Sequence, residues 1–144
     1  MKISARNIFE GKITSLVDGK VNAEVEVTTA GGDRIVAVVT KSSVQSLGLA
    51  LGKPVLAFVK APWVIAMAGD CGVKFSARNQ LAGTVQSIDK GAINSEVRIK
   101  LSGGTLVYAV ITNEAVMELG LKPGVTASAL IKASHVVLGV SESS

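Results

Sequence analysis

The chain has 144 residues, of which 48% are hydrophobic and 3% aromatic, and its formal net charge is +4. A core of Val, Ile, Leu and Ala is therefore expected, and three prolines argue against a disordered chain. The single cysteine, Cys71, excludes an internal disulfide and a cysteine-based metal cluster. The longest uncharged apolar run, residues 61–69, is about half as long as a bilayer span. Because no signal peptide precedes the first repeat, we expect a cytoplasmic protein.

Alternating apolar and polar residues predict three strands in the first part of the chain. Residues 8–16 place Phe9, Gly11 and Ile13 on one side, and residues 21–28 alternate most clearly. A turn at Asp18–Gly19 separates these two strands. Residues 31–33 then form a hairpin turn into residues 34–39, so the second and third strands should pair antiparallel.

A short helix is expected next. Thr40 is a favourable N-cap for residues 41–47, and Gly48 is a typical glycine stop. The same pattern recurs from Thr112 to Gly120. That second helix is the better one, because Glu114 in its first turn interacts favourably with the helix dipole.

Two further strands complete the unit. Residues 55–59 form the fourth, Lys60-Ala61-Pro62 interrupts the pattern, and residues 63–67 form a last apolar strand. Five short strands, with one small helix between the third and fourth, match the order of an OB-type five-stranded barrel.

The whole pattern occurs twice in the chain. Ser4–Asn7 returns unchanged as Ser76–Asn79, an offset of 72 residues, and the same shift places Glu24-Val25 on Glu96-Val97. Such self-similarity at a fixed period marks a duplicated module. We therefore predict a mainly all-β fold of two tandem OB-like five-stranded β-barrels, each with one short helix. The predicted boundaries are module 1 at 1–68, a linker at 69–73, module 2 at 74–140 and a frayed tail at 141–144.

The repeated tetrapeptide is rich in hydrogen-bond donors. Arg6 offers five N–H groups, Asn7 an amide and Ser4 a hydroxyl. Because the run contains no carboxylate and no base, we expect it to bind an anion rather than to move protons. The alternative is that Arg6 is a solvated surface charge and Asn7 a turn residue. Recurrence beside a recurring lysine favours binding.

Taken together, these motifs resemble the molbindin (Mop) family. The resemblance rests on Ser-Ala-Arg-Asn, the Val/Ile-Asn-Ala/Ser-Glu-Val strand, the Thr-capped helix and the Lys-Ala before the last strand. It covers nearly the whole chain, and the doubling is similar to the di-Mop members. It implies intracellular binding of molybdate or tungstate for molybdenum storage and homeostasis, without an organic cofactor. It also implies that six modules surround the anions, which for this chain means a homotrimer.

The resemblance implies two kinds of oxyanion site. The interface site would use the tetrapeptide, the capping threonine and the Lys-Ala run of both copies: Ser4, Ala5, Arg6, Asn7, Thr40, Lys60, Ala61, Ser76, Ala77, Arg78, Asn79, Thr112, Lys132, Ala133 and Ser134. Pro62 matches Ser134 but offers neither hydroxyl nor N–H, so first-copy sites would be weaker or differently built. An axial site would use the turn before the second strand: Lys20, Val21, Asn22, Ala92, Ile93 and Asn94. Since Ala92 replaces Lys20, the two ends should differ in affinity.

Simpler roles for several of these residues remain open. Thr40 and Thr112 could cap helices whether or not they bind an anion, and Lys60 and Lys132 could be solvated charges at strand ends.

Two other classes of function compete with anion binding. An OB-type nucleic-acid binder fits the barrel and the positive charge, but single strands usually stack on aromatic rings, and these are few. An enzyme is not favoured, because no paired acid and base are spaced for catalysis. Trp63 and the matching His135 are expected to pack rather than to bind a metal, and Cys71 is expected to be incidental.

Overall fold

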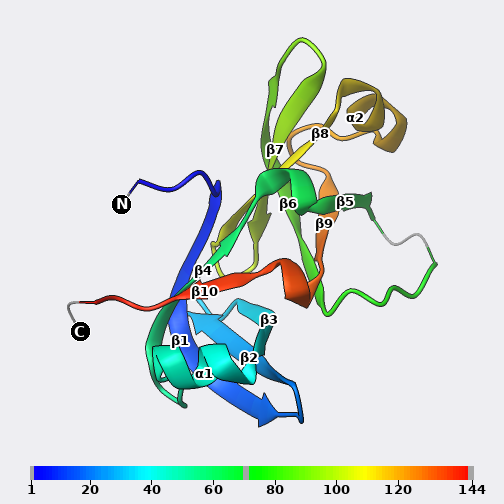
Figure 1. The fold of residues 1–144 in the computed structure, drawn as a ribbon. Coiled ribbons are helices and arrows are strands. Elements are labelled where there is room, and N and C mark those ends of the chain that lie inside the picture. Colours follow the sequence, from blue (N-terminus) through cyan, green and yellow to red (C-terminus); the bar gives the residue numbers. More distant parts are fainter. Residues whose placement is uncertain (1, 70–71, 143–144) are drawn as a thin grey trace.

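The computed structural model describes residues 2–69 and 72–142, which form two curled five-stranded antiparallel sheets (Figure 1). The first repeat contributes β1 (Asn7–Asp18), β2 (Asn22–Thr29), β3 (Arg34–Thr40), α1 (Lys41–Leu47), β4 (Pro54–Val59), the 3-10 helix η1 (Ala61–Trp63) and β5 (Ile65–Ala68). The second contributes β6 (Asn79–Lys90), β7 (Asn94–Leu101), β8 (Leu106–Thr112), α2 (Asn113–Leu119), β9 (Thr126–Ile131), η2 (Ala133–His135) and β10 (Val137–Gly139). The mainly β architecture and the position of each helix agree with the sequence prediction.

The predicted alternation sets the buried face of each strand. Val25, Val27 and Ile35 have no exposed surface, and β2 and β3 pair antiparallel as predicted. β1 curls so that it pairs with β2 on one side and β4 on the other. At this bend a Cβ on Gly11 would lie 2.4 Å from the carbonyl oxygen of Thr28, so the close approach of the strands requires glycine.

Both helices have the predicted caps. The hydroxyl of Thr40 accepts a hydrogen bond from the backbone N–H of Ser43, and that of Thr112 accepts one from the N–H of Ala115. Gly48 ends α1 in the left-handed region, at φ 62°, and the matching glycine ends α2 in the same way.

The fifth strand of each repeat lies in the sheet of the other repeat. The sheet orders are β10-β4-β1-β2-β3 and β5-β9-β6-β7-β8. In Figure 1, the C-terminal strand β10 leaves the second repeat and runs beside β4 of the first. The predicted last strand, residues 63–67, was wrong at its start, because Trp63 belongs to η1 and the strand begins at Ile65. Periodicity identified an apolar strand, but it did not identify the sheet that the strand joins.

Because of this exchange, each sheet contains strands from both sequence repeats. The module boundaries at 1–68 and 74–140 remain a prediction. The predicted linker (69–73) and tail (141–144) lie partly outside the described residues. Cys71 lies outside them.

The two repeats share one hydrophobic core. Buried side chains of both repeats form a single cluster, which includes Phe9 and Val59 from the first repeat and Val97 and Ile131 from the second. Within residues 2–69 and 72–142, no helix has the length and apolar character needed to cross a membrane.

The repeats meet through matching residues in an approximate twofold arrangement. A Cβ on Gly31 would lie 2.0 Å from the carbonyl oxygen of Gly103, its counterpart in the other hairpin turn. The carboxylate of Asp33 accepts hydrogen bonds from the N–H groups of Gly103 at 3.0 Å and Thr105 at 3.2 Å. Elsewhere along this contact, the rings of Trp63 and His135 pack together with centroids 4.8 Å apart. The halves are therefore fixed relative to each other at several places.

Candidate functional site

Strand register brings the tetrapeptide and the Lys-Ala run of one repeat to the same end of a sheet. Asn7 at the start of β1 lies opposite Val59 at the end of β4. Because the strands are antiparallel, Arg6 just before β1 and Lys60 just after β4 lie at neighbouring positions. The second copy repeats the arrangement between β6 and β9. Each repeat thus holds two predicted cationic residues at neighbouring backbone positions.

The asparagines of the tetrapeptides fasten the two repeats together. Asn7 and Asn79 are only 1% and 2% exposed. The Asn7 amide donates to the carbonyl oxygen of Tyr108 at 2.8 Å, and its oxygen accepts from the Tyr108 N–H at 2.7 Å. Asn79 makes the same pair of bonds to Val36, at 2.8 and 2.7 Å. Since β3 and β8 end their sheets, these amides pair backbone groups that an edge strand leaves open.

These two pairs of hydrogen bonds, which we call the asparagine clamp, limit the groups that Asn7 and Asn79 can donate to a ligand. Each amide oxygen and one amide N–H already have backbone partners, so the second N–H of each Nδ2 is the side-chain donor that remains. Anion binding by Asn7 and Asn79 stays a prediction, whereas their structural role follows directly from the contacts.

Arg6 is held by residues of the second repeat. Its Nε and Nη2 donate to the two carboxylate oxygens of Glu96 at 3.0 and 3.2 Å. Its guanidinium carbon lies 4.3 Å from the centroid of the Tyr108 ring. Glu96 also accepts from Arg98 at 3.5 Å. The hydrogen bond from Arg6 holds the pKa of Glu96 below its ordinary value, and the same bond raises the pKa of Arg6.

Arg78 is held in a related but different way. Its Nη2 donates to a carboxylate oxygen of Glu24, the counterpart of Glu96. Val36 stands where the other repeat has Tyr108, and Glu26 stands where it has Arg98. The strand that binds Arg78 therefore has a second carboxylate in place of an arginine, and no aromatic ring takes the place of Tyr108.

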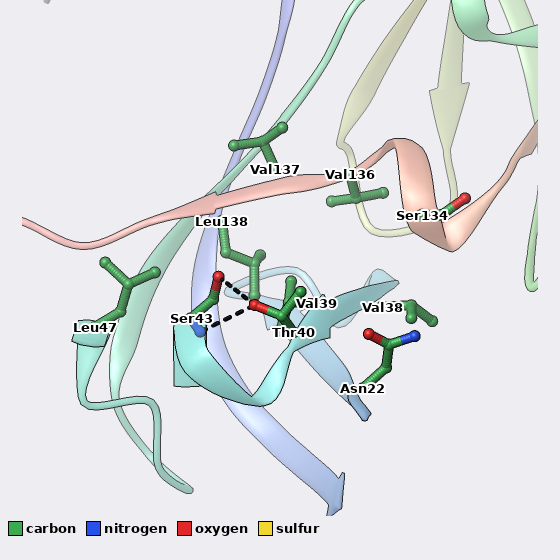
Figure 2. Close-up of a pocket in the computed structure, with 10 residues that line it drawn as sticks. All are labelled: Asn22, Val38, Val39, Thr40, Ser43, Leu47, Ser134, Val136, Val137 and Leu138. Carbon is green, nitrogen blue, oxygen red and sulfur yellow. Dashed lines mark hydrogen bonds between the residues drawn. The ribbon is translucent and has the colours of Figure 1, made fainter. Parts of the chain in front are cut away.

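A cavity of about 370 Å³ brings together residues from both predicted kinds of site (Figure 2). Asn22 and Thr40 are cross-strand partners at the end of the β2–β3 hairpin, and Ser134 reaches the cavity from η2. Their polar groups lie among apolar side chains such as Val38. The Thr40 hydroxyl also donates to the hydroxyl of Ser43 at 3.0 Å, so it serves the helix cap as well as the cavity wall.

The second tetrapeptide and this cavity follow the same edge of β3. Asn79 binds Val36, and the cavity is lined by Val38 and Thr40 farther along the strand. η2, which follows Lys132, packs against β3. The structure thus places Ser134, two residues after Lys132, in the same cavity wall as Thr40 of the first repeat. η1 packs correspondingly against β8, where Pro62 replaces the serine.

The predicted axial residues lie in two exposed turns. Val21 is 74% exposed and Ile93 is 75% exposed, and the other residues of this set, Lys20, Asn22, Ala92 and Asn94, are also exposed. Each turn is tied to a helix start: the carbonyl of Val21 accepts from the N–H of Lys41 at 3.1 Å, and that of Ile93 accepts from Asn113 at 2.8 Å. The predicted axial sites would need three symmetry copies of each turn, at opposite ends of an assembly, so they stay a prediction.

Comparison with known proteins now identifies the modules. The family model of the TOBE domain matches residues 3–66 and 76–138. The chain belongs to the TOBE-domain family. The two TOBE matches coincide with the two sequence repeats, and each contains one complete copy of the tetrapeptide.

The relatives of these TOBE repeats are molybdenum proteins. The crystal structure of the cytoplasmic molybdate-binding protein ModG, with molybdate bound, is 57% identical and has a TM-score of 0.92, covering 98% of this chain and 100% of that chain. The molybdenum transport protein ModE of Azotobacter vinelandii is 44% identical over 97% of this chain and 52% of its own length. The molybdenum-pterin-binding protein MopA of Rhodobacter capsulatus is 41% identical over 97% and 53%. The chain spans about half the length of these curated relatives.

These likenesses confirm the molbindin (Mop) resemblance and the predicted fold class. The names of the relatives describe binding or transport rather than catalysis.

The sequence analysis did not identify two kinds of residue near the predicted site residues. The first are Glu24 and Glu96, which bind the arginines of the tetrapeptides. Their recurrence at matching positions was visible in the sequence. Lys41 adjoins the first exposed turn, where the second repeat has Asn113, whose amide donates to the Gly91 carbonyl at 3.0 Å. A comparison of the charges at matching positions of the two repeats would have pointed to both the glutamates and Lys41.

Proposed function

We propose that this protein binds molybdate or tungstate in the cytoplasm, at interfaces between TOBE repeats, and serves molybdenum storage and homeostasis. The observation that carries the proposal is the near full-length likeness to ModG, a protein whose structure holds molybdate. The ligand is the oxyanion itself, with no organic cofactor and no catalytic step.

The chemistry of the grouped residues supports this proposal. A dianion taken out of water needs several hydrogen-bond donors and a compensating positive charge. Arg78, just before β6, and Lys132, just after β9, are neighbours along the backbone, because Asn79 lies opposite Ile131 in the strand pairing. The hydroxyl of Ser134 lies farther along the same edge. One chain offers few such donors at any single place, so donors from a second copy would complete the shell.

The assembly we propose is a homotrimer, in which six repeats surround the anions. Matched apolar residues favour self-association: Ile65 on β5 and Val137 on β10 are each 60% exposed, and Val21 and Ile93 are exposed still further. Paired apolar surfaces of this kind are typical of contacts between protein copies. The proposed partners are therefore small oxyanions and further copies of the chain, with neither a membrane nor a nucleic acid among them.

The aromatic residues do not favour the alternative of a nucleic-acid binder. Phe9 and Phe58 are buried and Phe75 is partly buried, Tyr108 lies under Arg6, and Trp63 is 46% exposed but packs against His135. Within the described residues, bases therefore find no row of open rings on which to stack.

Calorimetric titration with molybdate, tungstate and sulfate, combined with a mass measurement of the oligomer, tests the proposal. We expect saturable binding of molybdate or tungstate by a trimer, and weaker binding by Arg78→Ala. Arg34→Ala, which removes an exposed arginine outside the proposed site, is the matched control. A monomer that takes up neither anion would refute the proposal.

A further inference from the structure

Both arginines of the proposed anion site are bound by a glutamate of the opposite repeat. Arg6 is bound to Glu96 through two hydrogen bonds, and Arg78 is bound to Glu24. The two glutamates occupy matching positions on β7 and β2, so this is a repeated feature of the fold. Neither glutamate is among the residues that the sequence analysis predicted to bind an anion.

The geometry makes each glutamate a competitor of an incoming oxyanion. Glu96 occupies the Nε–Nη2 edge of the guanidinium, which is the edge that also suits two oxygens of a tetrahedral anion. An oxyanion at Arg6 must therefore displace the carboxylate or bind beside it through the remaining N–H groups. In both cases a dianion and a carboxylate share one cation, and their repulsion opposes binding.

The two copies differ in what surrounds this pair. Glu96 is also in contact with Arg98, which in turn donates to Asp89 at 2.7 Å, whereas the position matching Arg98 is Glu26. Neutralising Glu96 would thus leave the Arg6 guanidinium without its opposing charge, with a second guanidinium, that of Arg98, nearby and still paired with Asp89. Neutralising Glu24 would leave one, with a second carboxylate still close by in the same strand.

We propose that Glu96 and Glu24 are internal counter-ions that set the affinity of the two arginine sites, Glu96 more strongly than Glu24. Each carboxylate positions its arginine and returns to it as the oxyanion leaves, which makes binding readily reversible. This inference rests on the proposed function, since it describes how the same sites load and unload.

Glutamine substitutions test the charge separately from the positioning. Glu96→Gln keeps one acceptor oxygen for Arg6 but removes the negative charge, and Glu24→Gln does the same for Arg78. In full-length protein titrated with molybdate, we expect Glu96→Gln to bind about tenfold more tightly, equivalent to about 1.4 kcal/mol, and Glu24→Gln to bind more tightly by a smaller factor. Glu118→Gln, at an exposed position on α2, is the matched control and should bind like the parent.

The outcomes separate this inference from the function on which it rests. If the parent binds molybdate but Glu96→Gln binds equally or more weakly, the carboxylate acts by positioning alone, and the inference is wrong while the function stands. The same holds if the control tightens as much as Glu96→Gln, because net charge would then explain the change. A parent protein that binds no oxyanion overturns both. Circular dichroism of each variant establishes that the fold is retained.

Discussion

Replacing Asn79 by alanine should destabilise the whole molecule, because this side chain joins β6 of one repeat to β3 of the other. The substitution removes two hydrogen bonds to the backbone of Val36, at 2.7 and 2.8 Å, from a side chain that is only 2% exposed. Each lost bond costs about 1 kcal/mol, and a buried backbone group left without a partner costs about 1–3 kcal/mol. Because water can reach the edge of β3 in part, we expect a net loss of about 2–3 kcal/mol.

Urea unfolding followed by circular dichroism measures this loss. In thermal unfolding of a chain of this size, the same loss of free energy corresponds to a fall in the melting temperature of about 5–10 °C. Asn79→Asp is a sharper variant, since it keeps the acceptor for the Val36 N–H but places a carboxylate oxygen against the Val36 carbonyl. It should be at least as destabilising as Asn79→Ala.

The adjacent exposed amide provides the control. Gln80 donates to the Ala77 carbonyl at 3.2 Å within its own segment, so Gln80→Ala should change stability by less than about 0.5 kcal/mol. If Asn79→Ala were no more destabilising than Gln80→Ala, the clamp would contribute nothing, and Asn79 would have to be explained by anion binding alone.

Three further predictions follow from the fold and the ion pairs. Gly31→Ala should lower stability by more than about 2 kcal/mol in chemical unfolding, because its Cβ would lie 2.0 Å from the Gly103 carbonyl oxygen, whereas Ser102→Ala nearby should be nearly neutral. Removal of β10 should accelerate amide exchange in β4 of the first repeat more than in β9, and the opposite order would contradict the strand exchange. Finally, Arg6 lowers the pKa of Glu96 from 4.5, so their pair stabilises the fold above about pH 4.5 and this contribution is lost as the pH falls through the lower folded value. The thermal midpoint of the parent should therefore fall more steeply below pH 4.5 than that of Glu96→Gln; parallel curves would show that the pair adds no stability.

The local features of this protein were determined by sequence. Alternation fixed the buried face of β2 and β3, Thr40 and Thr112 fixed the helix starts, and their glycine stops fixed the helix ends. These features depend on residues that are close in the chain, where sterics and hydrogen bonding allow few conformations. The duplication was also visible, because the two copies have kept the same residues at the same offset.

Only the tertiary structure decided how the two copies use those elements. It placed β5 and β10 in exchanged sheets, gave Asn7 and Asn79 hydrogen bonds to the edge strand of the opposite repeat, and brought Glu96 to Arg6 across 90 residues of chain. Periodicity states which side of a strand is buried, but an edge strand can accept any partner that satisfies its hydrogen bonds. The choice of partner depends on the packing of the complete core, and for that reason the carboxylates beside the arginines emerged only from the folded molecule.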